Sequence, residues 1–188
     1  MSWISLHTHS QYSILDSTIS VQALATQAAQ YSMPAVGLTD FCNLFGAVEF
    51  SKACKGVGIK PLIGCEIMVA PFSCLSKKKL GNHPVGYPLI LIVKNQIGYK
   101  NLCKIASIAY LEGFYYTPRV DKEVLEKYAE GLICLSGSLT SRISQSIIHG
   151  KHNEVEEEIE WSKKIFKDDF YLELQRHRMS DEMIALDK

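Results

Sequence analysis

Short apolar runs alternate with amphipathic stretches along this chain, and this pattern predicts strands separated by helices. The apolar runs are bounded by glycine, proline or polar residues, as is typical of buried strands. The predicted strands are residues 3–6, 35–38, 59–69, 87–93, 131–135 and 170–174. The predicted helices are residues 21–33, 44–55, 96–110, 122–130, 141–149 and 153–166, and a further helical pattern follows residue 174.

The helix that follows Ser20 shows how the pattern is interpreted. Serine is a favoured N-cap residue, and Pro34 ends the helix because proline cannot donate the hydrogen bond that continuation requires. Between them the apolar side chains recur with helical spacing on one face. These side chains are Val21, Leu24, Ala25 and Ala28. We therefore expect one buried and one solvent-facing side.

Alternating strands and helices imply right-handed crossovers and a parallel sheet, either open and doubly wound or closed into a barrel. No glycine-rich phosphate-binding motif follows a predicted strand, which disfavours the nucleotide-binding open sheets. Polar residues instead recur at the carboxyl ends of strands, where a barrel builds its site. These residues are His7, His9, Asp40, Glu66, Ser136 and Ser138. We expect an α/β fold with an unfinished barrel.

Composition and charge narrow the class of protein. Apolar residues make up 47% of the chain and charged residues 21%, which is typical of a globular domain rather than a disordered one. The formal net charge is zero. A neutral domain is a poor non-specific DNA binder by itself, because such affinity comes from neutralising phosphates.

The cysteines and the apolar runs indicate the compartment. The six cysteines have no C-x-x-C spacing, so we expect reduced, buried thiols in a cytoplasmic protein. No signal peptide is apparent near Met1, and no apolar run reaches membrane-spanning length. We therefore expect a soluble protein with no membrane partner.

His7 and His9 form the most conspicuous chemical motif. On a strand, residues i and i+2 point to the same face, so the two imidazoles would project into one space. Converging neutral imidazoles suit zinc, manganese or iron. The alternative is that hydrogen bonds hold both rings at the end of a strand. The pair alone does not decide between these two interpretations.

Several longer stretches resemble the N-terminal PHP domain (polymerase and histidinol phosphatase) of bacterial replicative DNA polymerase III alpha subunits. The likeness is carried first by residues 6–16, 33–40 with Asn43, and 58–66. It continues through residues 94–95, 98–102, 118–119, 131–133 and 171–174. The resemblance implies a distorted seven-stranded β/α (TIM-like) PHP barrel over residues 1–188. It also implies that the barrel is truncated at its C-terminus here, with the polymerase palm, fingers and thumb absent.

The resemblance also implies a metal site at the carboxyl ends of the strands. The family's ligand positions that keep a ligand side chain fall on His7, His9, Asp16 and Glu66. Three further positions lack the family's ligand and carry Phe41, Pro88 and Ser138. A final Asp-x-His pair would lie beyond Lys188. Because phenylalanine and proline offer no donor and a hydroxyl is a poor ligand beside a thiolate, we expect a degenerate site.

We expect no catalytic residue in this degenerate site. The remaining ligand side chains would form a buried hydrogen-bonded network, with Phe41 filling the space of a lost ligand. The alternative is one weakly bound zinc or manganese ion on His7, His9 and a carboxylate. No other cofactor is expected.

The resemblance implies that the host protein is a DNA-directed DNA polymerase, a nucleotidyltransferase of DNA replication. The domain would then be a structural module that contacts the other polymerase domains and binds the proofreading exonuclease subunit. It would contact DNA only within the full-length enzyme. The alternative functions are a metal-dependent phosphoesterase or a residual 3′–5′ exonuclease, and a third is a separate exonuclease-binding module.

Overall fold

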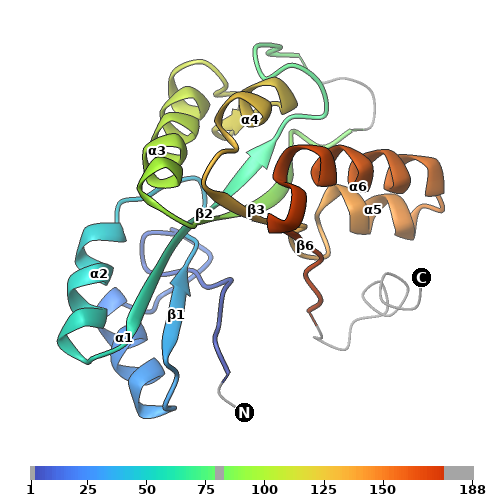
Figure 1. Cartoon of the computed structure of the whole chain (residues 1–188). Helices are drawn as coiled ribbons and strands as arrows, with labels where there is room; N and C mark the ends of the chain where they lie inside the picture. Colours follow the sequence, from blue (N-terminus) through green and yellow to red (C-terminus); the bar gives the residue numbers. More distant parts are fainter. Residues whose placement is uncertain (1–2, 79–82, 176–188) are drawn as a thin grey trace.

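The computed structural model describes residues 3–78 and 83–175 as six helices, a short 3₁₀ helix and six strands (Figure 1). The helices are α1 (Val21–Gln30), α2 (Ala47–Gly56), α3 (Gln96–Leu111), α4 (Lys122–Tyr128), α5 (Arg142–Ile148) and α6 (His152–Phe166), with η1 (Lys167–Asp169). The strands are β1 (Ala35–Leu38), β2 (Lys60–Val69), β3 (Tyr87–Val93), β4 (Arg119–Val120), β5 (Leu132–Leu135) and β6 (Phe170–Tyr171). The helical pattern predicted after residue 174 lies almost entirely outside the described residues.

Side-chain caps set where four of the helices begin. In each case the N-cap oxygen accepts a hydrogen bond from the backbone N–H three residues later, which satisfies a donor that the helix leaves free. The caps are Ser20 of α1, Asn95 of α3, Asp121 of α4 and Ser141 of α5. These local signals explain why the helices lie close to their predicted positions.

The prediction of an all-parallel sheet is wrong. β1 pairs with β2 in parallel, but β3 runs antiparallel to both β2 and β5. A parallel return requires a long crossover, usually a helix, and the described residues between β2 and β3 contain none. The chain therefore turns back on itself, which places Tyr87 and Pro88 beside Val69 and Met68 at the carboxyl end of β2.

The described residues form an open sheet in the order β1-β2-β3-β5-β6, with β4 paired to the end of β2 (Figure 1). β1 and β6 lie at its two edges, so the seven-stranded closed barrel is not confirmed. No helix in the described parts of the chain is long and apolar enough to cross a lipid bilayer.

The N-terminal segment lies alongside β1 but does not form the strand predicted at residues 3–6. The N–H of Gly37 donates to the carbonyl of Ser5 at 2.7 Å. Trp3 and Leu6 are 73% and 38% exposed, so they lack the burial that holds a regular strand in a sheet. The segment nevertheless lies so close to β1 that a Cβ on Gly37 would overlap the carbonyl oxygen of Leu6.

Gly37→Ala is therefore expected to push the N-terminal segment away from β1 and to lower the free energy of unfolding by about 2 kcal/mol. Urea denaturation measures the loss. Gly56→Ala is the matched control, because a Cβ there meets nothing within 4 Å. Equal stability of the two variants would contradict the close approach.

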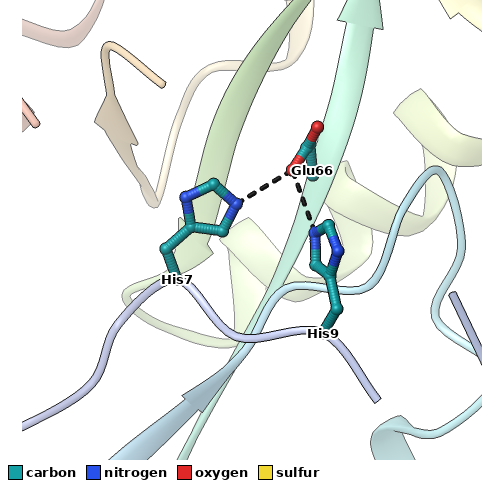
Figure 2. Close-up of side chains that lie close together, drawn as sticks. All are labelled: His7, His9 and Glu66. Carbon is teal, nitrogen blue, oxygen red and sulfur yellow. Dashed lines mark hydrogen bonds and ion pairs between the residues drawn. The ribbon is translucent and has the colours of Figure 1, made fainter. Parts of the chain in front are cut away.

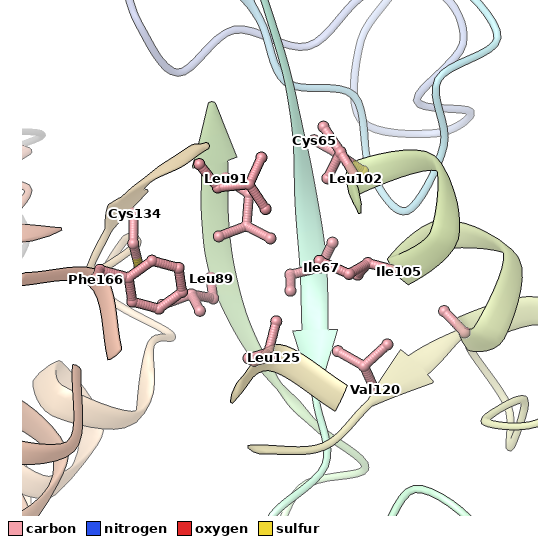
Figure 3. Packing of buried hydrophobic residues seen from close by; sticks show 12 residues of the cluster. Cys65, Ile67, Leu89, Leu91, Leu102, Ile105, Val120, Leu125, Cys134 and Phe166 are labelled. Atoms are coloured by element: carbon pink, nitrogen blue, oxygen red, sulfur yellow. The ribbon is translucent and has the colours of Figure 1, made fainter. Parts of the chain in front are cut away.

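The main core lies between the sheet and helices α3, α4 and α6 (Figure 3). It contains Cys65, Ile67, Leu89, Leu91, Leu102, Ile105, Ala109, Val120, Leu125, Leu132, Cys134 and Phe166. All six cysteines of the chain are free, and all but Cys103 are buried, as predicted. Because side chains alternate along a strand, burying Cys65 and Ile67 on this face turns Glu66 to the opposite face.

Candidate metal centre

Two neighbouring histidines of the N-terminal segment and a glutamate of β2 converge (Figure 2). Glu66 Oε2 lies 2.9 Å from His7 Nε2 and 2.9 Å from His9 Nε2. The two imidazole rings lie 5.4 Å apart, with 62° between their planes. The structure thus brings together His7, His9 and Glu66, each of which offers one ligand atom within 4.8 Å of the others.

The backbone around Thr8 explains how both histidines reach Glu66. The Thr8 N–H donates to the Thr39 hydroxyl at 2.9 Å, and the Thr39 N–H donates to the Thr8 carbonyl at 2.9 Å. These bonds hold the backbone between the two histidines against the end of β1, and the side chains of His7 and His9 both reach Glu66, as the i, i+2 spacing predicts. The pair lies beyond the carboxyl end of β1 rather than on a strand.

The electrostatics of the centre follow from burial and from two carboxylates. Burial lowers the pKa of His7, but the hydrogen bonds and charges of Glu173 and Glu66 outweigh it and raise the pKa to about 9. Burial likewise raises the pKa of Glu66, and the opposing hydrogen bonds and charges of His7 and His9 lower it to about 2. Without a metal, His7 is therefore a cation between two carboxylates at neutral pH.

The shifted pKa values of His7 and Glu66 predict that the stability of the metal-free protein depends on pH. The folded pKa of His7 lies above its ordinary 6.5, so its contribution is complete below pH 6.5 and is lost as pH rises through about 9. The folded pKa of Glu66 lies below 4.5, so its contribution is complete above pH 4.5 and is lost as pH falls through about 2. Urea denaturation with a chelator should show a decline of about 2 kcal/mol between pH 6.5 and 9. His7→Gln should flatten that decline, and an equal decline in this variant would contradict the prediction.

The other predicted site residues line an open pocket of about 890 Å³ around this centre. Asp16 is exposed on its wall and is not among the three converging residues. Phe41, Pro88 and Ser138 also line the pocket. The Ser138 hydroxyl lies 3.3 Å from that of Thr140. These three positions thus lie around the centre and bring no nitrogen or thiolate ligand to it.

Asp40 holds the loop that carries His9 and Asp16. Its carboxylate accepts hydrogen bonds from the Ser10 N–H at 2.6 Å, the Ser10 hydroxyl at 2.7 Å and the Ser13 hydroxyl at 2.6 Å. Asp40 is 1% exposed. The sequence marks it as a polar residue at a strand end, and the structure gives it a supporting role rather than a place among the converging side chains.

Sequence reasoning missed Glu173 and Gln175 as site residues. Glu173 Oε1 lies 2.7 Å from His7 Nδ1, and the Gln175 amide donates to the same oxygen at 2.6 Å. Both residues follow β6, so the signal that could have found them is the one used for the other strands, a polar side chain just past an apolar run.

The converging atoms suit a transition metal chemically. Two imidazole nitrogens and one carboxylate oxygen form a recognised set of ligands, and a carboxylate behind one imidazole is the usual outer-shell partner. His7, His9 and Glu66 are the residues that would hold such an ion. The same atoms are also fully paired by hydrogen bonds without one.

The protein is an α/β protein with a mixed sheet and a cluster of two histidines and a glutamate at its strand ends. The chain belongs to the PHP domain family, which it matches over residues 5–177. It is 48% identical over 186 residues to the DNA polymerase III alpha subunit of Chlamydia trachomatis, covering 99% of this chain and 15% of that protein. It is 48% identical over 183 residues to that of Borreliella burgdorferi, covering 97% and 16%. The resemblance found in the sequence is confirmed.

The likeness extends to more distant bacteria. The chain is 41% identical over 180 residues to the DNA polymerase III alpha subunit of Thermus aquaticus, covering 94% of this chain and 15% of the relative. The chain therefore spans about 15% of the length of such relatives.

The chain also resembles solved structures, some of them weakly. One of them, an amidohydrolase from Chromobacterium violaceum, aligns with 56% of this chain and 32% of its own length, with 23% identity and a TM-score of 0.42. A likeness of this size indicates neither a shared substrate nor a shared set of ligands.

Proposed function

We propose that this chain is the PHP portion of a replicative DNA polymerase alpha subunit and that it acts there as a structural module without hydrolytic activity. The carrying observation is the composition of the pocket wall. Phe41 and Pro88 offer no donor side chain, and Ser138 has only a hydroxyl. A hydrolytic site that generates hydroxide and polarises a phosphate usually needs two ions with several ligands each.

Phe41 also supports the structural role through its backbone. It forms an isolated parallel bridge with Glu66, and the neighbouring Cys42 N–H donates to the Glu66 carbonyl at 2.7 Å. Where the family pattern has a ligand, this chain thus uses the position to join the end of β1 to β2.

The second candidate function is metal-dependent phosphoester hydrolysis, and the convergence of His7, His9 and Glu66 favours it. One zinc or manganese ion on these residues would supply Lewis acidity. We predict that metal analysis and titration calorimetry of the purified chain give at most one ion per chain, with binding lost in His9→Ala. Two or more tightly held ions would contradict the degenerate site.

The structural function implies partners within a replication complex in the bacterial cytoplasm. These are the remaining polymerase domains and the proofreading exonuclease subunit, with DNA reached only through the full-length enzyme. Co-purification with the exonuclease subunit of the same organism tests the second partner. We expect the chain to form a complex with the exonuclease subunit. If neither the chain nor the full-length alpha subunit binds it, this partner is removed from the proposal.

A further inference from the structure

Glu173 makes a polar contact between two parts of the chain that lie far apart in the sequence. Its Oε1 lies 2.7 Å from Nδ1 of His7, which is 166 positions away in the sequence. The two side chains are only 11% and 14% exposed. The contact joins two segments at opposite edges of the sheet. One is the segment after β6, and the other is the N-terminal segment, which lies alongside β1.

Ser136 fixes the direction of Glu173. The Ser136 N–H donates to the Tyr171 carbonyl at 2.9 Å, and the Glu173 N–H donates to the Ser136 hydroxyl at 2.9 Å. Ser136 is 5% exposed and follows β5 directly. The backbone that carries Glu173 is therefore held at two points before its side chain reaches His7.

The chemistry of the two groups determines which of them donates the hydrogen bond. A carboxylate offers no hydrogen to donate, so a 2.7 Å contact requires that Nδ1 of His7 carries the proton and donates it. The nearby Gln175 amide, 3.1 Å from Nδ1, then donates to Glu173 Oε1 instead. With Nδ1 engaged, the ring is oriented so that Nε2 faces Glu66 and His9 (Figure 2).

The second observation concerns the other carboxylate oxygen of Glu173, Oε2. It is buried and has no hydrogen-bond partner within the described residues. Burying a carboxylate with one oxygen unpaired costs free energy, and the hydrogen bonds that Oε1 accepts from His7 and Gln175 offset this cost.

We propose that Glu173 is a positioning residue, which fixes the ring of His7 by accepting the hydrogen bond of Nδ1–H and so aims Nε2 into the centre. It does not contact a bound ion itself. In the metal-bound form it supplies the outer-shell carboxylate that holds an imidazole ligand in one orientation, and this part of the inference rests on the one-ion site proposed above.

The test compares wild type, Glu173→Ala and Glu173→Gln, with Glu160→Ala as the matched control because Glu160 is exposed on α6. In metal-free protein at pH 6, heteronuclear NMR of the imidazoles measures the exchange of the His7 Nδ1 proton with water. We expect this exchange to be at least about tenfold faster in Glu173→Ala and unchanged in Glu160→Ala. Glu173→Gln should be intermediate, because its amide oxygen still accepts a neutral hydrogen bond.

Zinc titration then measures the consequence. We expect a Kd about 10- to 100-fold weaker in Glu173→Ala than in wild type. Wild-type proton exchange in Glu173→Ala would overturn the proposal. If wild type binds no zinc, the one-ion function fails, and proton exchange alone decides the role of Glu173. If Glu173→Ala does not fold, Glu173→Gln decides, and exchange equal to wild type would overturn the proposal.

Discussion

Arg119→Ala is expected to lower the free energy of unfolding by about 4 kcal/mol and the melting temperature by about 10 °C. Arg119 belongs to β4 and is 4% exposed. Within the described residues, the hydrogen bonds of its guanidinium go to backbone carbonyls of the surrounding loops. The acceptors are Gly113 at 3.1 Å, Val85 at 3.2 Å, Cys74 at 3.1 Å and Ser76 at 2.9 Å. Alanine would remove a donor from each of these carbonyls, of which Cys74 would keep the Lys77 amine at 3.3 Å. The loop before β3 and the loop before β4 would lose their common anchor.

Urea denaturation followed by circular dichroism measures this loss. Arg119→Lys should recover only part of it, because one ammonium cannot reproduce the planar fork that reaches several acceptors. Lys52→Ala is the control for removing an exposed positive charge. A loss below about 1 kcal/mol in Arg119→Ala would show that water satisfies the freed carbonyls and that the guanidinium is not the anchor.

Asp40→Ala is expected to lower the free energy of unfolding by about 3 kcal/mol. The substitution removes the acceptor of three hydrogen bonds and leaves the Ser10 N–H and the O–H groups of Ser10 and Ser13 without an acceptor in a buried setting. The loop between His9 and α1 should then lose its fixed conformation, and His9 should move away from Glu66.

The measurement combines urea denaturation with the imidazole NMR signals of His9. Asp40→Asn should be intermediate, because the amide oxygen still accepts but without charge. Asp168→Ala, which removes an exposed carboxylate, is the control. Full stability of Asp40→Ala together with unshifted His9 signals would exclude Asp40 as the support of this loop.

The sequence predicts the helices well because their signals are local. Ser20 and Asp121 cap helices where serine and aspartate precede apolar periodic stretches. The direction of β3 could not be predicted in this way, since it depends on how residues 70–86 return along the sheet. Strand periodicity is identical in both directions.

The site residues likewise divide into those that local sequence patterns predict and those that they do not. The spacing of His7 and His9 predicts that they share a face, and the alternation along β2 is consistent with Glu66 facing them. The position of Asp16 on the exposed wall depends on a loop conformation, which includes a left-handed residue at Leu15, that composition does not reveal. Glu173 was missed because its contact crosses the whole fold.

Hydrolysis by the purified chain tests the central claim most directly. Release of nitrophenol from bis-p-nitrophenyl phosphate, and of nucleotides from single-stranded DNA, should be measured with manganese or zinc added. We expect no turnover above a His9→Ala control, because the positions of Phe41, Pro88 and Ser138 supply no ligands for a second ion. Metal-dependent hydrolysis by the wild-type chain that His9→Ala abolishes would contradict the structural role.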